Sequence, residues 1–261
     1  MTDLSPLIQP LLKIAKEAGD AILKIYKNEE DFGVESKDDN SPLTRADKAS
    51  NQVICDGLEA LDPAYPIISE ENKAIPYEER KDFEYCWLVD PLDGTKEFIK
   101  RNGEFTVNIA LLHKNKPVFG VVYAPVLDEM YWAIKGEGAF LKKEGAIQQL
   151  TMAPFSMQDE GLHVVSSRSH MNEETKAFVE KLKNPELVSK GSSLKFLMIA
   201  KGEAEVYPRV APTMEWDTGA AQIVLEEAGG KVLHFETGAP LDYNKENLLN
   251  PYFIAYGNVN D

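Results

Sequence analysis

Two aspartates stand at the end of a short apolar run near the middle of the chain, beside a glycine and a threonine. Residues 87–89 are typical of a buried strand, and Asp90, Asp93, Gly94 and Thr95 follow them. A proline directly after Asp90 cannot donate to a sheet, so we expect the strand to stop or bend there. Gly94 permits a sharp turn, and Thr95 can cap the helix that we expect next.

This arrangement suits a metal ion and a phosphate group. Two close carboxylates repel each other unless a proton or a cation lies between them. Mg²⁺ prefers oxygen ligands, and the N-terminus of a helix favours a phosphate. The alternative is a surface turn with two solvated aspartates, because Asp-Gly turns are common. An aspartyl-phosphate phosphatase needs its second aspartate two positions after the first, where this chain has Leu92, so we reject that class.

Three further segments carry a carboxylate at an element end. The apolar residues 65–68 lead into Ser69, Glu70 and Glu71. If this strand runs beside residues 87–89, Glu70 and Asp90 meet at one sheet edge. Taken alone, two adjacent glutamates are usually just solvated.

Asp47 and Asp217 each lie in the first turn of an expected helix. Thr44 is a suitable N-cap for the helix that contains Asp47, and Asp217 opens a helix expected over residues 215–228. Taken alone, either carboxylate could do no more than complement the helix dipole.

The four segments, taken together and in this order, resemble the motifs of the inositol monophosphatase superfamily of Mg²⁺-dependent, Li⁺-sensitive phosphatases. The resemblance spans nearly the whole chain. The matching stretches are Ser-Pro-x-Thr-x-Ala-Asp at 41–47, Gly-Glu-Glu at 69–71 with a serine in place of the glycine, Asp-Pro-Leu-Asp-Gly-Thr at 90–95, and Trp-Asp-x-x-Ala at 216–220.

The resemblance implies two to three Mg²⁺ ions and direct attack of an activated water on the phosphate. Its implied metal ligands are Glu70, Asp90, the carbonyl of Leu92, Asp93 and Asp217. Thr95, oriented by Asp47, would accept a proton from the water with Glu70 assisting. Its implied contacts to the scissile phosphate are Glu70, Leu92, Asp93, Gly94, Thr95 and Asp217.

Several stretches resemble one branch of that superfamily, the 3'(2'),5'-bisphosphate nucleotidases. They are Lys-Glu-Phe at 96–98, Ser-Ser-Arg-Ser-His at 166–170, Gly-Ser-Ser-Leu-Lys-Phe at 191–196, Tyr-Pro-Arg at 207–209, Pro-Leu-Asp-Tyr at 240–243 and Leu-Asn-Pro at 249–251. The branch implies contacts from His170, Ser192 and Lys195 to the nucleotide and its 5'-phosphate. Arg209 is a weaker candidate, and an exposed arginine without a ligand is the alternative.

The composition of the chain limits which classes of molecule it is expected to bind. The 261 residues carry a net charge of −15, which disfavours nucleic acid and anionic membranes but not a small anion bound through cations. The two cysteines fit a reduced, cytoplasmic compartment. We expect no signal peptide and no membrane span, because no apolar run is long enough. The resemblance leaves open a homodimer and peripheral association with the inner membrane.

The order of elements predicts an α/β (α+β) fold, and the resemblance implies a layered α-β-α-β-α sandwich. We expect residues 1–155 to pack helices on an antiparallel sheet, with a helix over 5–27 capped by Ser5 and a solvated loop over 72–86. Residues 156–261 alternate strands and helices and would form an α/β half that carries Asp217 and the substrate-selecting residues.

The resemblance to the nucleotidase branch implies hydrolysis of 3'-phosphoadenosine 5'-phosphate to AMP and phosphate, which would remove a by-product of sulfate assimilation. An inositol monophosphatase with the same metal site is the nearest alternative. A binding module that senses the nucleotide without catalysis is the alternative of another class.

Overall fold

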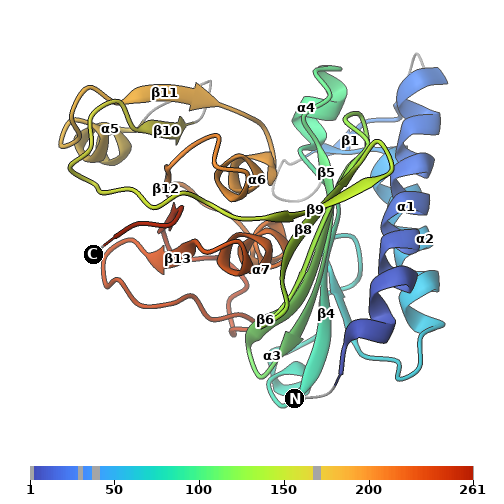
Figure 1. Cartoon of the computed structure of the whole chain (residues 1–261). Coiled ribbons are helices and arrows are strands. Elements are labelled where there is room, and N and C mark those ends of the chain that lie inside the picture. The colour runs from blue at the N-terminus through green and yellow to red at the C-terminus, as the bar shows by residue number, and fades with distance from the viewer. Residues whose placement is uncertain (1–2, 29–31, 37–41, 167–171, 261) are drawn as a thin grey trace.

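The chain forms five layers, alternating helices and sheets, as Figure 1 shows. The computed structural model describes residues 3–28, 32–36, 42–166 and 172–260. Helices α1 and α2 cover one face of a large sheet, helices α6 and α7 lie between that sheet and a second, smaller sheet, and α5 lies beyond the smaller sheet. The predicted layered sandwich is confirmed.

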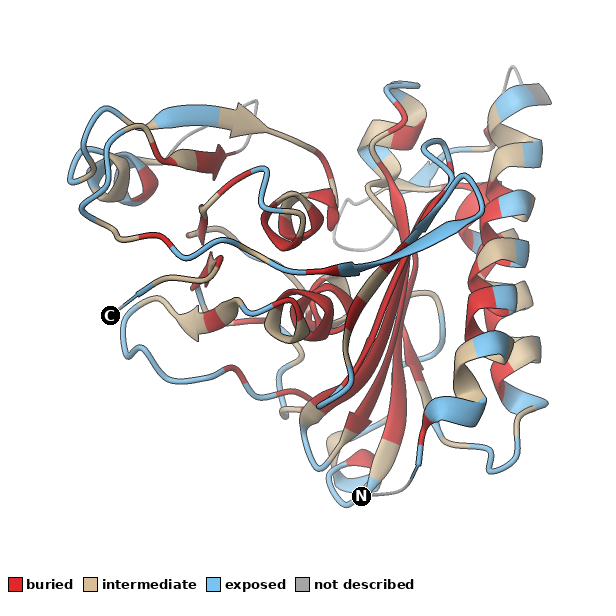
Figure 2. Ribbon diagram, in the orientation of Figure 1, coloured by how far each residue is buried: buried red, intermediate tan, exposed pale blue. Residues whose placement is uncertain are grey.

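The large sheet has seven strands in the order β3-β4-β5-β6-β7-β8-β9. Only β3 and β4 run parallel, and the remaining neighbours are antiparallel. Its strands are Ile67–Ser69, Tyr85–Asp93, Thr106–His113, Lys116–Ala124, Glu129–Ile134, Gly138–Lys143 and Ala146–Leu150. The central strands are buried on both faces, which Figure 2 shows as continuous red ribbon, because helices cover both sides.

The small sheet has the order β11-β10-β12-β14-β13. Strand β10 runs parallel to both neighbours, whereas β14 runs antiparallel to β12 and β13. Its strands are His163–Ser166 (β10), Glu186–Ser189 (β11), Val206–Arg209 (β12), Lys231–His234 (β13) and Phe253–Tyr256 (β14). A separate two-stranded ribbon pairs β1 (Glu35–Ser36) with β2 (Pro42–Leu43).

Seven α-helices and two 3₁₀ turns are found in the described part of the chain. The α-helices are α1 (Ile8–Asn28), α2 (Arg45–Glu59), α3 (Tyr77–Arg80), α4 (Thr95–Ile99), α5 (Glu173–Val179), α6 (Leu194–Ala200) and α7 (Gly219–Glu227), and the 3₁₀ turns are η1 (Ser5–Leu7) and η2 (Glu215–Asp217). None of the helices in the described ranges has the length and apolar character needed to cross a membrane.

Helix α7 is wedged between the two sheets and ties the layers together. All its residues from Gly219 to Leu225 are buried. It approaches β6 so closely that a Cβ on Gly120 would lie 2.5 Å from the Ala220 carbonyl oxygen. A side chain at position 120 would therefore push the central helix away from the sheet.

Some local predictions were wrong. Ser5 does not cap α1, because it belongs to the 3₁₀ turn that precedes the helix. Thr95 is the first helical residue of α4, and Gly94 with a φ of 98° is the N-cap. The expected helix over 215–228 is divided, so that Asp217 lies in η2 before α7 begins.

The stretch 72–86 is not simply a solvated loop. It contains α3, and the side chain of Arg80 is only 3% exposed. Its last two residues begin β4. That strand also continues past Asp90 to Asp93, with an irregular register that accommodates the proline.

Candidate active site

Two carboxylates meet where the parallel strands β3 and β4 end. Ser69 pairs with Val89 in register, and the backbone N–H of Glu70 donates to the Val89 carbonyl oxygen at 3.1 Å. Glu70 and Asp90 are therefore the next residues on adjacent strands. This is the juxtaposition that the sequence predicts from two apolar runs that each lead into an acidic residue.

Asp217 joins them from the far end of the chain. One carboxylate oxygen from each of Glu70, Asp90 and Asp217 lies within 4.8 Å of the other two, which makes this the cluster in the described residues that could hold a metal ion. The turn η2 carries Asp217, and its Oδ2 accepts the backbone N–H of Met214 at 2.9 Å. The role of these three residues as ligands stays a prediction, but their convergence is a property of the fold.

The cluster is electrostatically strained. Asp90 is 2% exposed, and burial, followed by repulsion from Glu70, Asp93 and Asp217, raises its pKa well above the ordinary value. Burial, followed by repulsion from Asp93, raises the pKa of Asp217 to about 8. Buried carboxylates held this close need protons or a cation between them, and an all-oxygen donor set fits a hard divalent cation.

Asp93 and Leu92 extend the cluster but take other partners in the protein. Asp93 Oδ2 accepts the backbone N–H of Ser193 at 2.5 Å and lies 3.5 Å from Asn108 Nδ2. Burial raises the pKa of Asp93, while the Lys195 ammonium opposes that rise. The Leu92 N–H donates to Asp90 Oδ1 at 3.0 Å. Asp93 is not one of the three residues whose oxygens converge within 4.8 Å.

Asp47 lies behind this cluster and is bound to Thr95. A capping box starts α2, in which Thr44 donates to Asp47 Oδ2 through its N–H at 2.7 Å and its hydroxyl at 2.5 Å. The other oxygen, Asp47 Oδ1, accepts the Thr95 hydroxyl at 3.1 Å. Burial raises the pKa of Asp47. The pairing of Asp47 with Thr95 that the resemblance implies is thus present in the structure.

Two hollows open beside these residues. We call the first the carboxylate hollow; it has a volume of about 460 Å³ and its lining includes Glu70, Asp90, Thr95 and Asp217. We call the second the cationic hollow; it has a volume of about 420 Å³ and its lining includes Ser192, Lys195 and Arg209. Asp93 and Asp217 line both, so the two are adjacent.

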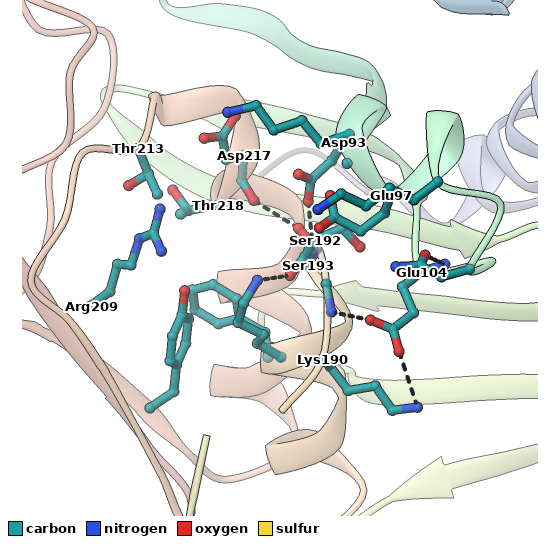
Figure 3. Close-up of a pocket in the computed structure, with 18 of the residues that line it drawn as sticks. Asp93, Glu97, Glu104, Lys190, Ser192, Ser193, Arg209, Thr213, Asp217 and Thr218 are labelled. Atoms are coloured by element: carbon teal, nitrogen blue, oxygen red, sulfur yellow. Dashed lines mark hydrogen bonds and ion pairs between the residues drawn. The ribbon is translucent and has the colours of Figure 1, made fainter. Parts of the chain in front are cut away.

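Figure 3 shows the cationic hollow, with Asp93 and Asp217 at the top, Arg209 at the left and Lys190 at the lower right. Ser192 has a left-handed backbone with a φ of 46°, and its carbonyl oxygen accepts Lys195 Nζ at 2.8 Å. Nη2 of Arg209 donates to the Pro212 carbonyl at 3.0 Å, and its buried Nε has no partner among the described residues.

Of the four residues predicted to contact the nucleotide, three line this hollow: Ser192, Lys195 and Arg209. The fourth, His170, lies outside the described residues.

Two residues that the sequence analysis missed connect the site. Ser193 donates its hydroxyl to the Asp217 carbonyl oxygen at 2.7 Å and accepts Asn108 Nδ2 at 2.9 Å. Together with its N–H bond to Asp93, Ser193 ties strands β4 and β5 of the large sheet to the turn η2 that carries Asp217. The available signal was Asn108 itself, a polar residue in an otherwise apolar strand.

A buried polar network behind Asp217 was also missed. The carboxylate of Glu215, which is 0% exposed, accepts the backbone N–H groups of Asn244 and Lys245 at 2.5 and 3.2 Å and also the Lys245 ammonium. Arg80 donates to Asn244 Oδ1 at 2.7 Å and to the carbonyls of residues 245 and 246. The segment after Glu70 is thereby tied to the turn that carries Asp217.

Comparison with known proteins agrees with this architecture. A model of the inositol monophosphatase family matches residues 3–255. The chain is 47% identical, over 248 residues, to the 3'(2'),5'-bisphosphate nucleotidase CysQ of Shigella flexneri, which covers 95% of this chain and 98% of that protein.

Solved structures show the same relationship. The crystal structure of CysQ from Bacteroides thetaiotaomicron aligns with a TM-score of 0.84 and 41% identity over 98% of this chain and 99% of that one. An inositol monophosphatase from Anabaena aligns with a TM-score of 0.75 and 25% identity over 99% and 93%. The chain therefore belongs to the inositol monophosphatase family and, within it, to the CysQ branch.

Proposed function

We propose that this protein is a Mg²⁺-dependent 3'(2'),5'-bisphosphate nucleotidase that hydrolyses 3'-phosphoadenosine 5'-phosphate to AMP and phosphate. The observation that carries the proposal is the adjacency of the two hollows, one lined by clustered carboxylates and one by Lys195 and Arg209. A substrate with two phosphate groups fits such a pair. The shared name of relatives that are 38–47% identical over nearly the whole chain supports it.

The metal site would be built from the converging carboxylates. Glu70, Asp90 and Asp217 would hold Mg²⁺, with Asp93 and the Leu92 carbonyl as further ligands, and we propose two to three ions. When bound, Mg²⁺ supplies neutralisation of the phosphate charge and activation of water. The raised pKa values of Asp90 and Asp217 support this assignment, because a cation removes the repulsion that raises them.

Thr95 and Asp47 would move the proton of the attacking water. The Thr95 hydroxyl donates to Asp47 Oδ1 at 3.1 Å, which leaves the lone pairs of Thr95 Oγ1 able to accept a proton from water. Burial raises the pKa of Asp47 and makes it a better proton acceptor than an exposed aspartate. Glu70 would assist from the end of β3.

The second phosphate group would bind in the cationic hollow. The buried Nε of Arg209 has no partner in the described residues and can donate to a phosphate oxygen. Lys195, held beside Ser192, adds a second charge. An inositol monophosphate has no second phosphate group to use these donors, which favours the nucleotidase over the inositol monophosphatase.

The proposal is tested by phosphate release from purified protein with Mg²⁺. We expect 3'-phosphoadenosine 5'-phosphate to be hydrolysed with a clearly higher kcat/KM than inositol 1-phosphate. Asp90→Asn should reduce release to the assay background while the far-UV circular dichroism spectrum stays unchanged. A preference for inositol 1-phosphate would refute the nucleotidase assignment, and no release from either compound would favour a nucleotide sensor.

Four further predictions accompany the function. They are the division into residues 1–155 and 156–261, a homodimer, a cytoplasmic location that allows peripheral association with the inner membrane, and a role in sulfate assimilation. Sedimentation velocity would test the homodimer, and fractionation of cells would test the location.

A further inference from the structure

Lys96 is the cation that reaches both hollows. It is the second residue of α4 and lines the carboxylate hollow and the cationic hollow. Among the described residues around the carboxylate hollow, it is the one lysine or arginine, beside Glu70, Asp90, Asp93 and other acidic residues. A positive group in that position offsets the negative field that an incoming phosphate would otherwise meet.

The ammonium group of Lys96 is also unengaged within the described part of the chain, where no hydrogen bond or ion pair involves it. Three other cations of the cationic hollow already have partners in the protein, whereas Lys100, which also has none among the described residues, does not line the carboxylate hollow. Lys190 lies 3.8 Å from Glu104, Lys195 donates to the Ser192 carbonyl, and Arg209 donates to the Pro212 carbonyl. Lys96 therefore keeps all three of its N–H donors for a ligand.

The backbone that carries Lys96 is held firmly. Thr95 bonds to Asp47 Oδ1 at 3.1 Å and to the Leu92 carbonyl at 3.3 Å. On the other side of Lys96, Phe98 is 0% exposed and its ring centroid lies 4.6 Å from that of Phe32. Because α4 is fixed at Thr95 and at Phe98, the backbone of Lys96 has a defined position beside the two hollows.

We propose that Lys96 is a specificity-determining residue, which contacts both phosphate groups of the substrate and so selects nucleotides that carry two. The proposal rests on the proposed function, because it requires one phosphate in each hollow. A lysine ammonium is a compact charge with rotatable donors, so it can serve two anions at once. Loss of the residue should therefore harm a bisphosphate more than a monophosphate.

The test compares two substrates that share the scissile group. The kcat/KM values of wild type and Lys96→Met are measured for 3'-phosphoadenosine 5'-phosphate and for adenosine 3'-phosphate, which lacks the 5'-phosphate. We expect the kcat/KM for the bisphosphate divided by the kcat/KM for the monophosphate to fall about 10-fold or more in the variant. This is the effect of one lost charged hydrogen bond. Lys96→Arg, which keeps the charge, should recover part of the ratio.

Lys135→Met is the matched control, because Lys135 is exposed and lines neither hollow. It removes the same charge elsewhere and should leave the ratio within twofold of wild type. A thermal melt of each variant shows whether it is folded.

The outcomes separate the two proposals. If wild type prefers the bisphosphate but Lys96→Met keeps the ratio within twofold, or Lys135→Met lowers it equally, the assignment of Lys96 is wrong and the function stands. An equal loss on both substrates also overturns the assignment, because Lys96 then serves only the scissile phosphate. If wild type releases no phosphate from the bisphosphate, both proposals are wrong.

Discussion

Replacing Asp217 with asparagine should stabilise the metal-free protein while it destroys the metal site. Burial and repulsion raise the pKa of Asp217 from 3.8 to about 8. An acid whose pKa is raised by folding contributes stability that is complete below the unfolded pKa and lost as the pH rises through the folded pKa. Asparagine keeps an oxygen for the Met214 N–H and has no proton to lose.

The magnitude follows from that pKa. At about 1.4 kcal/mol per pH unit, deprotonation of this carboxyl lowers the unfolding free energy of the wild-type protein by at most about 4 kcal/mol between pH 3.8 and pH 7. Water reaches part of the side chain, so this is an upper limit. In a chain of 261 residues the corresponding rise in Tm for the variant is on the order of 10 °C.

The assay is thermal and urea unfolding of wild type and Asp217→Asn in a chelator, from pH 4 to pH 8. We expect equal stability near pH 4 and a growing advantage of the variant up to pH 8. Saturating Mg²⁺ should remove most of that advantage, because at 100 times its Kd one bound ion adds about 2.7 kcal/mol to the unfolding free energy of wild type. Asp82→Asn, at an exposed position, is the control and should change neither curve.

Two results would refute the reasoning. If the variant in chelator is no more stable than wild type at pH 8, the carboxylates of the cluster do not repel one another as strongly as their geometry implies. If Mg²⁺ stabilises the variant as much as wild type, Asp217 is not needed to hold the ion.

Three other substitutions test the supports of the site. Thr44→Ala removes the capping box of α2 and should cost about 1 kcal/mol of unfolding free energy together with activity; unchanged urea unfolding would contradict it. Arg80→Met leaves Asn244 Oδ1 and three carbonyls unpaired, so we expect roughly 3 kcal/mol lower stability and a higher Mg²⁺ concentration for half-maximal activity. An unaltered Mg²⁺ requirement would show that the network does not support the site. Gly120→Ala should lower the unfolding free energy by about 1–3 kcal/mol, because the new Cβ would lie 2.5 Å from the Ala220 carbonyl; a Tm equal to wild type would disprove that close contact.

Local chemistry determined part of this protein from the sequence alone. The apolar runs that end in Glu70 and Asp90 became adjacent parallel strands, because burial on both faces needs unbroken apolar residues. Thr44 caps α2 with Asp47 in its first turn, because the preference for both residues is set within one turn of helix. The motif order also indicated the family, which the comparisons confirm.

Other features could not be predicted, because they depend on contacts between distant segments. Residues 72–86 read as a solvated loop, since nothing nearby shows that Arg80 would find carbonyl acceptors at residues 245 and 246. Asn108 is conspicuous in its strand, but its partner Ser193 is the N-cap of α6, 85 residues further along the chain.

The sequence by itself determined which residue types stand at the ends of which elements, because strand, helix and cap preferences act over a few neighbouring residues. Only the tertiary structure decided that Asp217 lies within 4.8 Å of Glu70 and Asp90 and that Lys96 faces two hollows at once. Those distances result from the packing of α7 between two sheets, and that packing sums many weak contacts that no local pattern encodes.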